Sequence, residues 1–164
     1  MHDLSLYLLD ILENSVRAGA TTIAVGVVAD RRVDTLTISV EDDGPGLPVT
    51  ANEALDPFFT TKKGKKTGLG LSLFRQAAEA AGGGLSVARS QDLGGVAVRA
   101  WMGLGNVDRP PLGDVATTMA TMVITTPDVD FTVEVTDGDE HLRLSGEELP
   151  QRLPDLVACQ KALA

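Results

Sequence analysis

One cysteine, few aromatic residues and no long apolar run characterise this sequence. Cys159 is the only cysteine among the 164 residues, which excludes an internal disulfide and predicts a reducing, cytoplasmic compartment. No apolar run approaches the roughly 20 residues of a membrane span. The first ten residues also lack the basic segment of a signal peptide. We therefore expect a protein without membrane association.

The charge balance is acidic, with a formal net charge of −9. A surface of that sign repels phosphate backbones, so we expect no nucleic-acid partner. Because aromatic residues make up only 4% of the chain, the core must rest on Leu, Val, Ile and Ala. The apolar share of 43% and the charged share of 23% are typical of globular proteins rather than disordered ones.

Hydrophobic periodicity predicts helices that alternate with pairs of strands. Apolar residues at helical spacing predict a helix over 4–17, with Asp3 as its N-cap, and a second helix over 69–81. Alternating residues predict strands at 21–29, 34–41, 85–90 and 95–102. This order predicts an α/β sandwich, in which helices pack on one face of a mixed sheet.

The composition changes near residue 105, where Pro110 and Pro111 interrupt regular structure. We place a domain boundary there, between residues 1–104 and a small α+β extension, 105–164, that serves partner docking. In the extension we expect a helix at 112–124 and a hairpin around "TDGDE". Its tail reads as weakly helical, broken by Pro150 and Pro154.

Polar residues share one face of the first predicted helix. Asp10, Asn14 and Arg17 are spaced at i, i+4 and i+7, so they project from the same side. A carboxylate one turn before an amide is a reasonable pair to hold Mg²⁺ and its waters, since this ion takes oxygen ligands and keeps several waters.

An acidic glycine turn follows the second predicted strand. Asp42 and Asp43 precede Gly44, Pro45 and Gly46. A hairpin needs only one Asp-Gly pair, so the extra residues point to a ligand or a second bend. A carboxylate at a strand end can accept from an exocyclic amine, while glycines let the backbone approach a flat ring.

A lysine-rich loop precedes the second predicted helix. Lys62, Lys63, Lys65 and Lys66 stand just before "TGLG", residues 67–70. Gly68 and Gly70 bracket the helix start, and helix N-termini bind phosphate through free N–H groups. Screening acts over about 8 Å, so a bound phosphate would sense this loop more than the acidic total.

Four motifs together resemble the Bergerat-fold ATPases, which include gyrase, the large heat-shock chaperone, sensor histidine kinases and mismatch-repair ATPases. Residues 13–20 are similar to the family's N-box, and residues 42–46 to its first glycine box. "DPFFTTK" resembles the phenylalanine box of histidine kinases, and "TGLGLSL" their second glycine box. The motifs occur in the family's order over residues 4–102.

The resemblance implies an ATP site with assigned residues. Asp42 would hold the adenine amine, Asn14 would coordinate Mg²⁺, and the lysine loop would form the ATP lid. The full set of nucleotide-contacting residues that it implies is Asn14, Arg17, Asp42, Gly44, Gly46, Phe59, Lys62, Lys63, Thr67, Gly68, Leu69 and Gly70. The loop lacks the P-loop spacing, so we expect no P-loop protein.

The sequence departs from the hydrolysing members of this family at Asp10, where they carry a glutamate as general base. Aspartate is one methylene shorter, and misplacing a base by about 1 Å can cost on the order of 100-fold in rate, so we expect slow hydrolysis at best. Val96 also stands where the family usually has threonine.

The resemblance implies a protein partner. The sequence contains no helical segment with a phosphoacceptor histidine ahead of the N-box, so we expect phosphate transfer to another protein, as in anti-sigma-factor serine kinases. "DRPPLGD" is similar to stand-alone ATPase-domain proteins of hydrogenase gene clusters. A weak ATPase with Asp10 as base, and a non-catalytic module gated by nucleotide, are alternatives. The sequence also leaves a homodimer open.

Simpler structural roles are alternatives at each of these positions. Asp42 can belong to an ordinary turn, Asn14 can bond a neighbouring carbonyl, and Asp10 can pair with Arg17. Phe59 can be a core anchor. The lysines can be a solvated loop, and Gly68 and Gly70 can serve helix packing.

Overall fold

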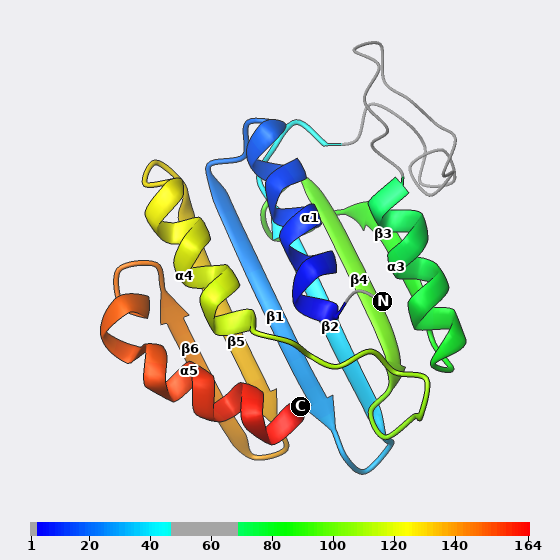
Figure 1. The fold of residues 1–164 in the computed structure, drawn as a ribbon. Helices are drawn as coiled ribbons and strands as arrows, with labels where there is room; N and C mark the ends of the chain where they lie inside the picture. Colours follow the sequence, from blue (N-terminus) through cyan, green and yellow to red (C-terminus); the bar gives the residue numbers. More distant parts are fainter. Residues whose placement is uncertain (1–2, 47–68) are drawn as a thin grey trace.

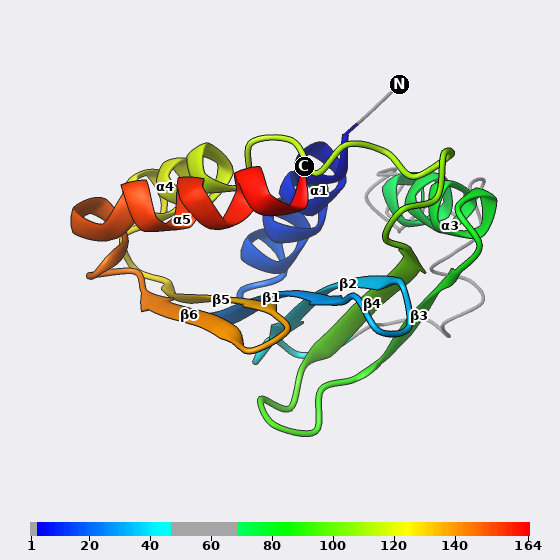
Figure 2. The ribbon, with the colours of Figure 1, turned by 90° about the horizontal axis from the view of Figure 1, so that it is seen from below.

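One six-stranded sheet and four helices make up the part of the chain that this computed structural model describes (Figure 1). The described residues are 3–46 and 69–164, with only the backbone described at Leu69. Viewed along the sheet, all four helices lie on the same face (Figure 2). The predicted α/β sandwich with helices on one face is confirmed.

The element bounds follow the sequence prediction closely. The helices are α1 (Leu4–Arg17), α3 (Leu69–Ala80), α4 (Val115–Thr125) and α5 (Leu149–Leu163). The strands are β1 (Thr22–Asp30), β2 (Thr35–Asp42), β3 (Gly84–Arg89), β4 (Val96–Gly103), β5 (Asp130–Asp137) and β6 (Glu140–Ser145). Asp3 caps α1 as expected, because its carboxylate accepts the backbone N–H of Leu6 at 3.0 Å.

The strands are arranged in the order β3-β4-β2-β1-β5-β6. β1 and β5 run parallel, and the other four neighbouring pairs are antiparallel, so the sheet is mixed. The parallel pair needs a crossover, which α3, the β3–β4 hairpin and α4 provide along the chain. This topology brings β1 and β2 to the centre of the sheet.

The core lies between the sheet and the helix layer. Leu4, Leu8 and Leu12 form the buried stripe of α1, and each has 0% exposure. Burying such a side chain contributes roughly 1.5–3 kcal/mol. Tyr7 of α1 stacks on Phe74 of α3 with ring centroids 4.9 Å apart. This stack fixes the two helices that carry the predicted site residues.

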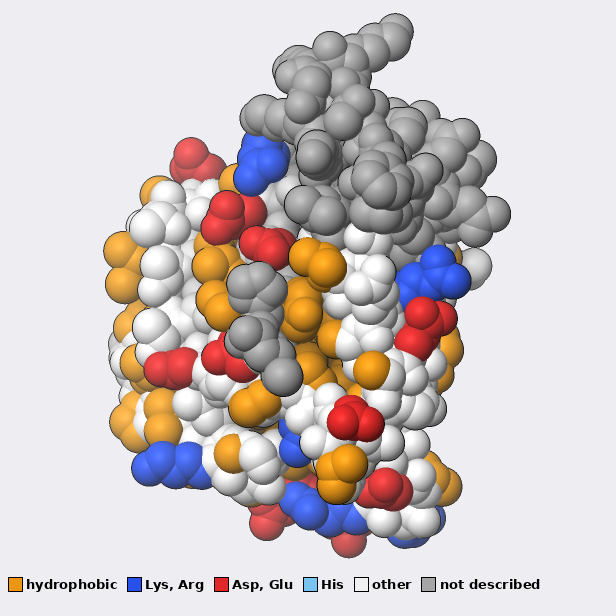
Figure 3. Space-filling model, turned by 45° about the vertical axis from the view of Figure 1, so that its right-hand side comes forward, with side chains coloured by type: hydrophobic (Ala, Val, Ile, Leu, Met, Phe, Trp, Pro, Cys, Tyr) orange, Lys and Arg blue, Asp and Glu red, His pale blue; other side chains and the backbone are white. Residues whose placement is uncertain are grey.

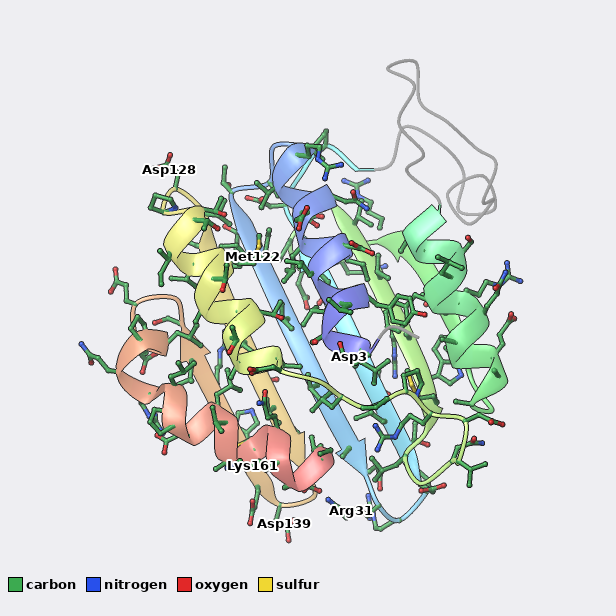
Figure 4. All side chains as sticks on the ribbon, viewed as in Figure 1. Asp3, Arg31, Met122, Asp128, Asp139 and Lys161 are labelled. Carbon is green, nitrogen blue, oxygen red and sulfur yellow. The ribbon has the colours of Figure 1, made fainter. Side chains whose placement is uncertain are left out.

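The C-terminal strands continue the same sheet. β5 pairs with β1 along the whole strand, and β6 adds at the edge. The segment before α4 also crosses the start of α1, near the label of Asp3 in Figure 4. There the backbone N–H groups of Leu4 and Ser5 donate to Pro111 and Leu112 at 2.9 and 3.0 Å. The proposed boundary at residue 104 stays a prediction about independent units.

The tail differs from the prediction at Pro150 and agrees with it near Pro154. Pro150 lies in the first turn of α5, where its missing N–H costs nothing, so it starts the helix rather than breaking it. The backbone leaves helical geometry at Arg152, two residues ahead of Pro154, so a kink interrupts α5 there, and the helix then continues to Leu163. Within residues 3–46 and 69–164, no helix has the length and apolarity that a membrane crossing requires.

Candidate functional site

Asp42, the last residue of β2, lies in a buried network. Its side chain is 4% exposed although it carries a carboxylate. The Ser15 hydroxyl donates to Oδ2 at 2.7 Å, and the backbone N–H groups of Gly44 and Val96 donate to Oδ1 at 3.0 Å each. Three donors from three segments therefore fix the orientation of this carboxylate.

This network leaves acceptor capacity at one oxygen of Asp42. An ionised carboxylate offers about four lone-pair sites, two on each oxygen. Both sites on Oδ1 are taken by backbone N–H groups, whereas Oδ2 accepts one hydroxyl. A buried carboxylate that is firmly held, with one acceptor site free of these partners, can select a ligand that brings a hydrogen-bond donor.

Two glycines allow the chain to pass close to this carboxylate. A Cβ at Gly95 would overlap Oδ1 of Asp42 and lie 2.6 Å from the Gly44 nitrogen. A Cβ at Gly44 would lie 3.2 Å from the same oxygen, which is a tight contact. The Gly95 N–H also donates to the Asp42 carbonyl at 2.9 Å, so the turn before β4 is locked onto the acidic turn.

Asp43 has a different role from its neighbour. Its carboxylate accepts the backbone N–H groups of Thr21 and Thr22 at 2.7 and 2.9 Å, and the Thr21 hydroxyl at 2.6 Å. These hydrogen bonds, that of the Thr21 hydroxyl first, lower the pKa of Asp43 to about 2. The two aspartates therefore have different roles: Asp43 binds the turn to the start of β1, and Asp42 lies on the buried side.

Asn14 and Arg17 lie together at the end of α1. Arg17 Nη1 donates to Asn14 Oδ1 at 3.5 Å, at the limit of a hydrogen bond, and Nη2 is 3.6 Å from Glu13. The alternative pairing of Arg17 with Asp10 is not found among the salt bridges of the described residues. Asn14 is half-buried.

Asp10 lies against the first turn of α3. A Cβ built on Gly70 would be 3.5 Å from Oδ2 of Asp10, which is ordinary contact. Asp10 is exposed and follows Tyr7 by one helical turn, and the pKa of Tyr7 is raised by burial first and then by the Asp10 charge. The structure thus joins Asp10 and Gly70, which are far apart in sequence.

Several predicted site residues fall outside the described residues. They are Phe59, Lys62, Lys63, Thr67 and Gly68, and with them the predicted lid; at Leu69 only the backbone is described. Figure 3 shows charged side chains of both signs on the surface next to the grey segment. Gly46 is described and has a φ of +88°, a conformation that glycine adopts at low cost.

Sequence reasoning missed three residues that hold Asp42: Ser15, Gly95 and Val96. Ser15 directly follows Asn14, so the N-box itself pointed to this position. Gly94 and Gly95 form a doublet before β4, a signal of close backbone approach. Val96 departs from the family's threonine, and it contributes its backbone N–H, which any residue but proline supplies.

The residues of this site fit a metal ion that is coordinated mainly by a bound substrate and water rather than by protein side chains. Within 3–46 and 69–164, no three His, Cys, Asp or Glu side chains form a group able to hold a metal ion. Mg²⁺ usually binds through one or two protein oxygens together with substrate phosphates and waters. The Asn14 amide oxygen, whose only described donor is 3.5 Å away, suits such a role.

The sequence profile described as "Histidine kinase-, DNA gyrase B-, and HSP90-like ATPase" matches residues 2–106. Among curated relatives, the sensor histidine kinase CpxA of Escherichia coli K12 is 34% identical over 101 residues, which are 58% of this chain and 21% of CpxA. The sensor protein kinase PilS of Pseudomonas aeruginosa is 38% identical over 84 residues, 48% of this chain and 16% of PilS. The matched segment therefore covers about a fifth of the length of each of these relatives, or less.

The MutL ATPase domain of Aquifex aeolicus, solved with ADP, has a similar fold. It superposes with a TM-score of 0.53 and 18% identity, over 96% of this chain and 70% of that one. At this identity the likeness concerns the fold alone. It extends beyond residue 106, so the C-terminal strands are included in the shared fold.

Proposed function

Because the chain belongs to the family of histidine kinase-, DNA gyrase B- and HSP90-like ATPases, we propose that it binds ATP with Mg²⁺ and transfers phosphate to, or switches, a partner protein. Family membership identifies an ATP-binding domain of the histidine kinase type. The single cysteine and the acidic charge support a cytoplasmic protein without a nucleic-acid partner.

The observation that carries this proposal is the arrangement around Asp42. The buried carboxylate has one acceptor site on Oδ2 beyond its described donors, and the adenine amine is the donor that would use it. Ser15 keeps Oδ2 oriented, while Gly44 and Gly95 keep the surroundings free of side chains. A charge-assisted hydrogen bond of this kind contributes roughly 1.5–3 kcal/mol.

Asn14 and the first turn of α3 are suited to the phosphate end of the nucleotide. Asn14 would hold Mg²⁺ through its amide oxygen, and the bound ion would neutralise phosphate charge. The N-terminus of α3, with Gly68 and Gly70, would supply N–H groups for the phosphates. We assign Lys62 and Lys63, outside the described residues, to the same phosphates.

A partner bound to the extension has a physical connection to this site. The N–H of Asp130, at the start of β5, donates to the Thr21 carbonyl at 2.8 Å, and Thr21 in turn binds Asp43. At the other end, residues 111 and 112 bind the start of α1. Docking on residues 105–164 can therefore act on both the acidic turn and the helix that carries Asn14.

A slow ATPase is the second candidate, and the position of Asp10 favours it. Its exposed carboxylate lies beside Gly70, next to the proposed phosphate site. A carboxylate there can orient water and accept its proton. In the kinase proposal the same carboxylate only helps to position the reacting groups.

Calorimetric titration with ATP and Mg²⁺ tests nucleotide binding. Asp42→Asn keeps the size of the side chain, and its amide can still accept the two backbone N–H groups, but it presents a donor to the adenine amine. We expect ATP affinity to fall roughly 10- to 100-fold with the fold retained. Asp139→Asn, an exposed change in the turn between β5 and β6 (labelled in Figure 4), at the other end of the strands from Asp42, is the control. Unchanged affinity in Asp42→Asn would refute the assignment.

Incubation with γ-labelled ATP separates the two candidates. Phosphotransfer predicts label on a protein in a partner-containing extract and none on this chain alone. Slow hydrolysis predicts free phosphate from the purified chain, which Asp10→Asn would abolish while ATP affinity stays. If Asp10→Asn leaves phosphate release unchanged, Asp10 is not the base.

A further inference from the structure

None of the described elements covers the face of the sheet opposite the helices (Figure 2). Side chains on a strand alternate between faces, so the residues next to buried ones point to this open face. On β4, for example, Val98, Ala100 and Met102 are buried in the core, whereas Arg99 and Trp101 are exposed on the other side. We call this surface the open face.

Strand pairing arranges the open face in three rows, each crossing all six strands. In the order β3, β4, β2, β1, β5, β6, the first row is Gly84, Trp101, Thr37, Val28, Thr136 and His141. The second row is Ser86, Arg99, Ser39, Gly26, Glu134 and Arg143. The third row is Ala88, Ala97, Glu41, Ala24, Thr132 and Ser145.

The centre of the open face has small side chains and two exposed apolar ones. Gly26 and Ser39 are paired at its middle, with the two Cα atoms in register. Trp101 is 38% exposed and Val28 is 41% exposed, and both lie in the first row. A solvated antiparallel face usually places charged side chains at such central positions. Small residues at the middle allow a second sheet to approach closely.

Charges of opposite sign lie at equal distances from the centre. Arg99 is on β4 and Glu134 is on β5, each one strand beyond the central pair β2 and β1, in the same row. Within the part of the chain that the structure describes, Arg99 forms no salt bridge. Among the same described residues, the only ionic partner of Glu134 is His141, at 3.0 Å.

We propose that a second copy of this chain packs on the open face, sheet against sheet. A two-fold axis along the strands, between β1 and β2, exchanges the two sides of the sheet. It therefore places Arg99 opposite Glu134 of the partner subunit, twice in each interface. Stacked sheets lie about 10 Å apart, a gap that these side chains can span.

The same axis also brings compatible side chains together in the first row and beside the axis. Trp101 comes to lie over the partner's Thr136, and Val28 over the partner's Thr37, so each exposed apolar side chain meets a small one. Ser39 and Gly26 lie next to the axis, where the two sheets are closest. The helices, and Asp42 on the helix side of β2, face outward, so the dimer leaves both nucleotide sites uncovered. The proposal does not depend on nucleotide binding.

The test is the mass of the full chain by sedimentation over a series of concentrations. The wild type should be a dimer at high concentration. Arg99→Glu and Glu134→Arg should each raise the dissociation constant roughly tenfold or more, because each places like charges opposite one another. The double variant Arg99→Glu/Glu134→Arg should restore the dimer. Arg75→Glu, on the outer surface of α3, is the matched control and should leave the dimer intact.

The only tryptophan provides a second measurement. Since Trp101 lies in the proposed interface, its emission should shift to shorter wavelength and resist iodide quenching as the concentration rises. Both effects should be absent in Arg99→Glu. A wild type that stays monomeric at its highest soluble concentration overturns the proposal. So does a dimer that neither charge reversal weakens, or whose loss the double reversal does not repair.

Discussion

The two ends of α1 carry the same pair of residue types in two different roles. At the N-terminus, Ser5 donates to Asp3 at 2.6 Å; near the C-terminus, Ser15 donates to Asp42 at 2.7 Å. Both serines are buried. Asp3 uses its oxygen Oδ1 for Ser5 and for the Leu6 N–H of its own helix, so this end is a cap.

The difference between these ends lies in what surrounds the carboxylate. Asp42 is held by three segments of the chain and keeps an acceptor site on Oδ2, whereas the Asp3 carboxylate accepts from Ser5 and Leu6 of the helix that it caps. A glycine packs tightly at each end: Gly95 on Asp42, and Gly113 on Asp3 and Ser5. In our proposal the same chemistry is therefore structural at one end and directed to a ligand at the other.

The largest effects are expected from the two glycines. In Gly95→Ala the new Cβ would overlap Asp42 Oδ1 and backbone atoms that cannot move aside. In Gly113→Ala it would lie 2.5 Å from Asp3 Cγ, at a φ of +77°. Each substitution should lower the free energy of unfolding, measured in urea, by on the order of 1–3 kcal/mol. Only Gly95→Ala should also lose ATP binding in calorimetry; equal ATP affinities would erase the distinction between the ends.

The serines give the next effect and the closest match. Ser15→Ala and Ser5→Ala each remove one hydroxyl that donates to a carboxylate from a buried position. Ser15→Ala leaves Oδ2 of the buried Asp42 without that donor, so we expect its free energy of unfolding to fall by about 1–3 kcal/mol. The fall should be smaller for Ser5→Ala. ATP affinity should fall only in Ser15→Ala. A fall in both would mean that the affinity follows the stability of α1 rather than the orientation of Asp42.

Asp43 predicts a smaller, pH-dependent effect. Because its pKa is lowered from 3.8 to about 2 in the folded state, its contribution to stability is present above about pH 3.8 and is lost as the pH falls toward 2. Asp43→Asn should therefore be less stable than the wild type at pH 6, and the difference should shrink at pH 2–3. Urea unfolding at both pH values measures it. The other carboxylates of lowered pKa, including Asp137, titrate in both proteins and cancel. A constant difference would contradict the role of Asp43.

Arg17 predicts the smallest effect. Its ion pair with Glu13 spans 3.6 Å between half-exposed side chains one helical turn apart. Such pairs contribute about 0.3–0.5 kcal/mol, so Arg17→Gln should barely lower the free energy of unfolding in urea. The difference from the wild type should also disappear at high salt, which screens this ion pair. A loss of more than about 1 kcal/mol would give this end of α1 a structural role beyond the Ser15–Asp42 bond.

The sequence by itself determined the elements of this protein and named its candidate site residues. Local periodicity and turn residues are local properties, so the bounds of α1, β1, β2 and the hairpin of β5 and β6 could be read within about two residues. The motifs likewise identified Asp42, Asn14 and Asp10 as candidates, because their spacing along a helix or after a strand is also local.

The tertiary structure alone decided which distant groups meet. Nothing near Asp42 in the sequence indicates that Ser15, Gly95 and Val96 converge on it, or that β5 joins β1 in parallel. These contacts link residues separated by tens of positions, and they depend on the order of strands in the sheet. Likewise, a single strand shows which of its residues alternate, but only the assembled sheet aligns Arg99 and Glu134 in one row of the open face.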